Sequence, residues 1–200
     1  MSSSSPDQGL VVAAPLRIEA RALRRGAPLR VLRTGVGPRR ATKAAQRLAA
    51  ERASAVAVAG LCGALEPGLE PGDVVLASEL YAAGEPCWTL DPDPLRRALL
   101  RLGLPVVVGR VVCVESVVRG AARQRLADEG AVAVDMESAW LAPGAAGRPF
   151  AVLRIVLDGP GHELLRPALP RQALRALRRL REAAPALAHW AQDESAPAAS

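Results

Sequence analysis

The chain has 200 residues, of which 50% are hydrophobic, so it can bury a core without disulfides or bound metal ions. Its 26 basic side chains outnumber its 20 acidic ones and give a formal net charge of +6. Aromatic residues make up only 2% of the chain, too few for the stacking surfaces that bind single-stranded nucleic acid. We therefore expect the arginines to lie on solvated helix faces, and we expect no nucleic-acid partner.

Targeting and redox features favour a cytoplasmic protein. The apolar runs are too short to span a membrane, and the Ser-rich first eight residues lack the basic and apolar regions of a secretory signal. The three cysteines, Cys62, Cys87 and Cys113, lie far apart and form no CxxC pair. This spacing argues against a disulfide framework and against a metal site.

Short apolar runs and helical periodicity alternate along the chain. In chain order, we predict a strand over 9–14, a helix over 16–25, a strand over 29–32, a helix from Pro38 to about residue 49, a strand over 55–59, a Gly/Pro-rich loop over 60–72, a strand over 73–80, a helix over 93–102, a strand over 105–112, a helix over 120–128, a strand over 131–134, a short helix over 135–141, a strand over 150–156 and a helix over 170–184. Residues 1–8 and 192–200 have no periodicity and are expected to be disordered tails.

This alternation predicts one α/β domain over residues 9–191. The expected architecture is a three-layer α/β/α sandwich with a mostly parallel, mixed central sheet. In such sheets, ligands bind outside the carboxyl ends of the strands. The residues that directly follow each predicted strand are therefore the candidates for a functional site.

Acidic residues follow several of the predicted strands. Glu19, Glu115, Glu137 and Asp158 all lie at or just past carboxyl ends. Each one alone has an ordinary explanation, such as a helix start or a turn. Together with Arg17, they indicate a site that binds a polyhydroxylated or cationic ligand and performs acid chemistry.

Two glycine-containing segments, Gly35–Gly37 and Gly60–Ala64, also follow predicted strands. Glycine there lets backbone N–H groups approach an anion or a sugar oxygen closely. Neither segment fits the dinucleotide-binding or P-loop pattern. Tight turns that need glycine would explain either segment equally well.

The order of these segments resembles the nucleoside phosphorylase superfamily, which includes purine nucleoside phosphorylases and methylthioadenosine/S-adenosylhomocysteine nucleosidases. The resemblance rests on Gly35-Val36-Gly37, Ala59-Gly60-Leu61-Cys62-Gly63-Ala64, Pro71-Gly72-Asp73-Val74-Val75, Val134-Asp135-Met136-Glu137-Ser138 and Val152-Leu153-Arg154-Ile155-Val156-Leu157-Asp158. The match runs from about residue 10 to residue 180. The Asp-Met-Glu-Ser form looks closest to the hopanoid-associated phosphorylases, which remove adenine from adenosylhopane.

The resemblance implies a role for each matched acid. Glu137 would accept hydrogen bonds from the ribose hydroxyls, with Met136 packed beside the sugar. Asp158 would protonate or hydrogen-bond N7 of the purine. Glu19 matches the glutamate that orients the attacking water in nucleosidases, whereas Arg17 resembles the arginine that holds phosphate in bacterial phosphorylases.

Further positions carry weaker assignments. By the same resemblance, the nucleophile side would be formed by Gly35, Gly60 and Leu61, and the base pocket by Val117 and Asp135. Arg154, inside an apolar strand, is expected to pair with Glu137 or Asp158 and to support them. Three positions depart from the family pattern in losing a polar or aromatic side chain: Leu61, Val117 and Leu157.

The predicted activity is cleavage of the N-glycosidic bond of a purine nucleoside, with adenine as the expected base and phosphate as the co-substrate. Phosphate is favoured because a bidentate contact with Arg17 outweighs the hydroxyl lost at Leu61. No organic cofactor or metal is implied. A hydrolytic nucleosidase using Glu19 and a degenerate nucleoside-binding member stay open as alternatives. Family members bury part of the site against a neighbouring subunit, so a homo-oligomer is expected.

Overall fold

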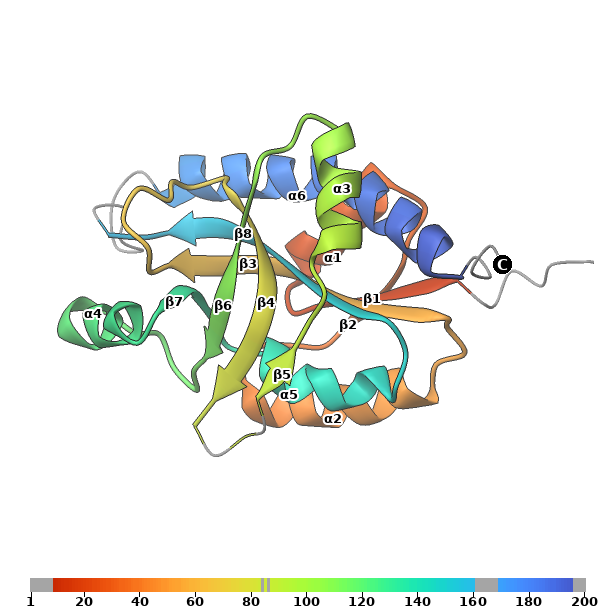
Figure 1. Cartoon of the computed structure of the whole chain (residues 1–200), viewed down its shortest axis with the longest axis horizontal. Helices are drawn as coiled ribbons and strands as arrows, with labels where there is room; N and C mark the ends of the chain where they lie inside the picture. The colour runs from red at the N-terminus through yellow and green to blue at the C-terminus, as the bar shows by residue number, and fades with distance from the viewer. Residues whose placement is uncertain (1–8, 84, 86, 161–168, 196–200) are drawn as a thin grey trace, which may run out of the picture.

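The protein forms one mixed sheet of eight strands between two layers of helices (Figure 1). The computed structural model describes residues 9–83, 85, 87–160 and 169–195. The strands are β1 (Leu10–Ala14), β2 (Arg30–Arg33), β3 (Ala55–Ala64), β4 (Val74–Ala82), β5 (Trp88–Thr89), β6 (Val106–Cys113), β7 (Ala131–Asp135) and β8 (Phe150–Asp158). The helices are α1 (Arg17–Gly26), α2 (Pro38–Ala50), α3 (Asp93–Arg101), α4 (Gly120–Asp128), α5 (Ser138–Leu141), the 3-10 turn η1 (Ala142–Ala145) and α6 (Leu169–Ser195).

The two faces of the sheet bury separate apolar layers. Alternate residues of β1 illustrate this, because Val12 packs toward α1, α3 and α6, whereas Val11 packs toward α2 and α5. Figure 1 shows these helices on opposite sides of the strands. The predicted three-layer α/β/α sandwich is therefore confirmed.

The strand order is β2-β1-β3-β7-β6-β4-β5, and β8 pairs with both β3 and β4. The β3–β7, β4–β8 and β4–β5 pairs are antiparallel, and the other pairs are parallel. Strands β3, β8, β4, β6 and β7 thus form a closed circuit of pairing. This circuit means that part of the sheet curls round on itself.

Strand β3 changes neighbours along one of its edges. It pairs with β1 over Ala55–Val58 and with β7 at Gly63–Ala64, while β8 runs along its other edge from Val56 to Gly63. Within the described sheet, the stretch 59–62 has no strand beside it on the β1/β7 edge. We call this stretch the sheet gap, and a gap of this kind opens a crevice for ligands.

The prediction of a loop from residue 60 was wrong in its first five positions. Gly60–Ala64 continue β3, because β8 keeps pairing with this strand as far as Gly63 and β7 pairs with Gly63 and Ala64. Asp135, predicted as a helix start, is instead the last residue of β7, and α5 begins at Ser138.

The C-terminal helix is longer than predicted. Helix α6 continues past Pro185 to Ser195, so the expected tail from residue 192 starts within a helix. Proline inside a helix costs about 3 kcal/mol. The buried side chains of Leu187 and Trp190, which lie beyond the proline in the core, offset that cost. The other predicted tail, residues 1–8, lies outside the described residues.

None of the helices in the described ranges combines the length and the apolar character that crossing a bilayer requires.

Candidate active site

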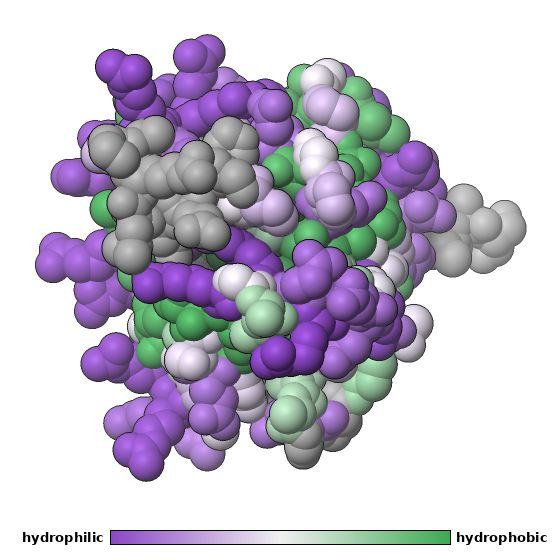
Figure 2. Space-filling view, turned by 90° about the vertical axis from the view of Figure 1, so that its left-hand side faces the viewer, coloured by the Kyte–Doolittle hydropathy of each residue, from purple (hydrophilic) through white to green (hydrophobic). Residues whose placement is uncertain are grey.

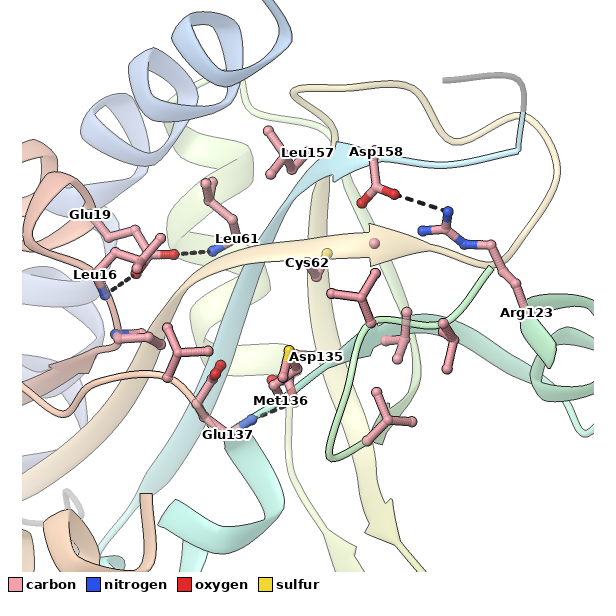
Figure 3. Close-up of a pocket in the computed structure, with 17 residues that line it drawn as sticks. Leu16, Glu19, Leu61, Cys62, Arg123, Asp135, Met136, Glu137, Leu157 and Asp158 are labelled. Atoms are coloured by element: carbon pink, nitrogen blue, oxygen red, sulfur yellow. Dashed lines mark hydrogen bonds and ion pairs between the residues drawn. The ribbon is translucent and has the colours of Figure 1, made fainter. Parts of the chain in front are cut away.

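A pocket with a cavity of about 170 Å³ opens beside the sheet gap (Figure 3). Its walls come from the carboxyl ends of β1, β3, β7 and β8, from the segments after β2 and β6, and from α4. The apolar lining comprises Pro15, Leu16, Val36, Leu61, Val114, Val117, Val118, Val134, Met136 and Leu157. The charged lining comprises Glu19, Arg123, Asp135, Glu137 and Asp158. Three of the four acids predicted to meet at one rim do so, namely Glu19, Glu137 and Asp158, whereas Glu115 is exposed and does not line the pocket.

Glu19 closes the sheet gap from the side of α1. One carboxylate oxygen accepts a hydrogen bond from the Leu16 N–H at 2.6 Å, which caps the helix start. The other oxygen accepts a hydrogen bond from the Leu61 N–H at 2.8 Å, where a neighbouring strand would otherwise pair. Burial raises the pKa of Glu19, although the two backbone hydrogen bonds lower it. A carboxylate with a raised pKa is suited to accept a proton near neutral pH.

Glu137 lies at the bottom of the pocket, directly after β7. Its Oε1 accepts a hydrogen bond from the Gly37 N–H at 3.1 Å, and its Oε2 is 3.8 Å from Arg154 Nη2. Burial raises the pKa of Glu137 to about 7, while Arg154 lowers it and Asp135 raises it. Met136 also lines the pocket.

Asp158, the last residue of β8, lies across the pocket from Glu19 (Figure 3). Its Oδ2 accepts a hydrogen bond from Arg123 Nη1 at 2.9 Å, and both side chains are only 9% exposed. Arg123 comes from α4 and was missing from the sequence prediction. The helical periodicity of α4 gives no signal that marks this arginine among the many others.

Arg154 is fully buried in the middle of β8 and holds the acidic residues together. It forms an ion pair with Asp135, lies near Glu137, and its Nη2 donates a hydrogen bond to Ser138 Oγ at 2.7 Å. The expected pairing with Glu137 is thus present. The expected pairing with Asp158 is not, because Asp158 pairs with Arg123.

Gly60 gives Glu19 and Arg154 the room to approach β3. A Cβ at this position would lie 2.8 Å from Glu19 Oε1 and 2.9 Å from Arg154 Nη1. Real Cβ atoms do not come so close to other heavy atoms, so a larger residue here would force the Glu19 and Arg154 side chains to shift. Gly60 does not line the pocket, but it leaves the space that the Glu19 and Arg154 side chains occupy.

Asp135 lines the pocket, but its carboxylate is occupied by neighbours. It accepts hydrogen bonds from the Cys113 thiol at 2.8 Å, from the Glu137 N–H at 3.2 Å and from Ser138. Together with Arg154, these contacts fix the start of α5. Asp135 therefore supports the start of α5, and its role in the base pocket stays a prediction.

Arg17 and Gly35 lie outside the pocket wall. Arg17 is exposed, because residues two apart on a helix point about 200° apart and Glu19 takes the inward direction. Gly35 has a φ of 84°, which favours glycine, and its N–H donates a hydrogen bond to the Pro15 carbonyl.

Exposed hydrophobic side chains surround the mouth of the pocket. Leu16 and Val36 are each 37% exposed and Val117 is 52% exposed, and all three are lining residues. Figure 2 looks onto this end of the molecule and shows hydrophobic surface bordered by hydrophilic residues. The mouth is thus apolar, whereas the acids lie deeper.

The arrangement separates three chemical tasks. Glu19 and the Asp158–Arg123 pair face each other across Leu61 and Cys62, with Glu137 below them (Figure 3). Glu19 can take a proton from a nucleophile, and the opposite pair can meet a leaving group that gains negative charge. Glu137 can accept hydrogen bonds from hydroxyl groups between them.

Solved structures with this fold include three enzymes named for nucleoside cleavage. The first is a mutant 5′-methylthioadenosine/S-adenosylhomocysteine nucleosidase of Helicobacter pylori with 5′-methylthioadenosine in its active site, with a TM-score of 0.74, 16% identity and coverage of 93% of this chain and 99% of that one. The second is the S-adenosylhomocysteine nucleosidase of Streptococcus pyogenes in complex with 5-methylthiotubericidin, with a TM-score of 0.74, 21% identity and coverage of 96% of this chain and 99% of that one. The third is futalosine hydrolase of Helicobacter pylori, with a TM-score of 0.75, 15% identity and coverage of 94% of this chain and 98% of that one.

No curated protein matches the chain at a significant level. Residues 17–188, in contrast, match the family described as the phosphorylase superfamily. This match confirms the resemblance drawn from the sequence motifs, and with it the expectation of an enzyme. The chain belongs to the phosphorylase superfamily.

Proposed function

We propose that the protein hydrolyses the N-glycosidic bond of a purine nucleoside and releases the free base. The observation that carries this proposal is the position of Glu19, buried at the sheet gap and facing the Asp158–Arg123 pair across the pocket. The structural neighbours named for hydrolytic nucleosidases support it. Adenine stays the expected base, since two of those neighbours are named with adenosine derivatives or their analogues.

In the proposed reaction, Glu137 accepts hydrogen bonds from the ribose hydroxyls and holds the sugar between the two other acids. The C1′–N9 bond breaks and its electron pair moves onto the purine. The oxygen of a water held by Glu19 forms the new bond to C1′, and the proton of that water passes to Glu19. Asp158 enters this step in its protonated form, outside the ion pair with Arg123, and supplies its proton to N7 of the departing purine.

Water is preferred over phosphate because of the charges that line the pocket. The sequence-based preference for phosphate depended on Arg17 facing the same crevice as Glu19, and Arg17 lies outside the wall. Among the described lining residues, Arg123 is the only cation and it is paired with Asp158. Three further carboxyl groups in the wall would repel a phosphate dianion.

The test is release of adenine from adenosine with and without phosphate, with the sugar product identified. We expect free ribose at an undiminished rate in phosphate-free buffer. Glu19→Gln should lose about 10²–10⁴-fold of this rate, the usual effect of losing a general base. Arg17→Ala is the matched control from the same helix turn and should stay within about threefold of the wild type.

A phosphate requirement with ribose 1-phosphate as product, lost in Arg17→Ala, would instead establish phosphorolysis. Absence of base release from any nucleoside would favour a degenerate, non-catalytic member of the superfamily.

A second expectation concerns the pH dependence of riboside binding. Only the carboxylate form of Glu137 accepts two hydroxyl hydrogen bonds, and its pKa is about 7. The KM for a riboside should therefore rise about tenfold as the pH falls from 8 to 6. Glu137→Gln should show a high KM that no longer changes over this range. A wild-type KM that is flat between pH 6 and 8 would contradict the assignment.

The same raised pKa has a consequence for stability. A carboxyl whose folded pKa lies above its unfolded value stabilises the fold at low pH, and this contribution is lost as the pH rises from about 4.5 to about 7. The free energy of unfolding of Glu137→Gln, measured with urea, should accordingly be higher relative to the wild type at pH 8 than at pH 5.

The homo-oligomer and the finer resemblance to hopanoid-associated phosphorylases stay predictions.

A further inference from the structure

Arg123 brings a permanent positive charge into the part of the pocket where the proposed leaving group would lie. Its guanidinium is almost entirely buried and enters the pocket from the α4 side, next to Asp158 (Figure 3). It is the sole buried residue of α4. Burying a charge is costly, so packing alone does not explain why the one buried residue of this short helix is an arginine.

The guanidinium has a donor that the described part of the chain does not use. Nη1 donates to Asp158, whereas Nε is buried with no hydrogen-bond partner among the described residues. Nη2 lies over Gly63, where a Cβ would be only 2.3 Å away. A buried donor without an acceptor is unfavourable, so Nε suits an acceptor that arrives with a ligand.

The apolar surroundings of Arg123 strengthen the electrostatic interaction of its charge with a ligand. Val114, Val118, Val134 and Leu157 line the same pocket and contribute no polar side-chain group. In such an apolar environment, a fixed cation interacts more strongly with developing negative charge than it would in water.

We propose that Arg123 is a catalytic residue that stabilises the departing purine. This inference rests on the proposed function and deepens it. As the C1′–N9 bond breaks, the electron pair moves onto the purine, and Arg123 donates an N–H to the ring and compensates the negative charge that builds up before the proton arrives. When Asp158, protonated at the start of this step, passes its proton to N7, its carboxylate returns to the ion pair with Arg123 that the structure shows, and this pair stabilises it.

A purely structural role is the competing explanation, because the same ion pair ties α4 to the end of β8. The two roles predict different responses to the leaving group. A purine needs help to leave, whereas p-nitrophenolate is stable as an anion without it. Loss of a charge-stabilising residue should therefore slow cleavage of a nucleoside much more than cleavage of p-nitrophenyl riboside.

The experiment compares wild type, Arg123→Gln and Arg123→Lys in kcat for adenosine and for p-nitrophenyl riboside, with thermal unfolding measured for each protein. For adenosine, Arg123→Gln should lose about 10²–10³-fold in kcat, the usual effect of removing one electrostatic donor. For p-nitrophenyl riboside it should lose less than tenfold. Arg123→Lys keeps the charge and should lose less than Arg123→Gln for adenosine.

Equal losses for both substrates, or adenosine turnover within threefold of wild type in Arg123→Gln, would overturn the inference. If Arg123→Gln does not fold, the ratio of the two substrates in Arg123→Lys decides by the same criterion. Failure of the wild type to cleave either substrate would instead overturn the proposed function, so the two failures are distinguishable.

Discussion

Asp158→Asn should remove most of the turnover while the fold survives. The amide cannot give a proton to N7 and forms no ion pair with Arg123, so both contributions to the leaving group weaken together. General acid help alone is typically worth about 10²–10⁴-fold in rate. The measurement is kcat for base release from adenosine, with circular dichroism and thermal unfolding to verify the fold.

A matched control for this variant is Asp73→Asn. Asp73 follows a turn outside the pocket, where its carboxylate caps the Glu70 N–H. It should keep turnover within about threefold. If Asp158→Asn retained a rate near that of the wild type, Asp158 would have no part in the chemistry.

Arg154→Met should produce the largest loss of stability of any single substitution in the site. Arg154 is fully buried and is the cation that faces Asp135 and Glu137. Removing one partner of a buried charge pair leaves uncompensated charge and costs about 3–5 kcal/mol. Urea unfolding at pH 7 measures this loss, and the exposed Arg178→Met should change the free energy of unfolding by no more than about 0.5 kcal/mol.

The loss of unfolding free energy in Arg154→Met should be smaller at lower pH. Arg154 lowers the pKa of both Glu19 and Glu137, so without it these groups take up protons more readily in the folded state. Protonation removes the uncompensated negative charge, and the variant regains stability as the pH falls. A deficit that is equal at pH 5 and pH 7 would show that lost packing, and not charge, dominates.

The sequence predicted three of the acids that meet, but its reasoning accounts for only part of the result. Strand and helix periodicities alternate clearly, and the carboxyl ends of parallel strands lie at one edge of a sheet. Asp158 ends β8, which runs parallel to β3, so this rule places it. Strand β7 runs antiparallel to β3, so Glu137 reaches the pocket only because the sheet curls round on itself. The rule for parallel strands also places Glu19, because it lies in the first helix turn after β1.

Other features could not be predicted because they depend on direction or on partners distant in sequence. Arg17 and Glu19 are two positions apart, and only the packing of α1 decides which of them faces the pocket. Arg123 reaches Asp158 from 35 residues away, through a helix with no clear periodicity. Gly60–Ala64 look like a loop by composition, and only pairing with β8 and, at Gly63 and Ala64, with β7 makes them a strand.

At the sheet gap, one hydrogen-bond donor of the site belongs to the main chain and does not depend on the side chain at its position. The hydrogen bond to Glu19 comes from the main-chain amide of Leu61, so a change of side chain at position 61 alters what covers the nucleophile but leaves the donor in place (proline alone excepted). Substitutions in the pocket lining can therefore change its shape without removing the amide that holds the Glu19 carboxylate. The position of Glu19, the proposed proton acceptor, is fixed in this respect by the connectivity of the strands.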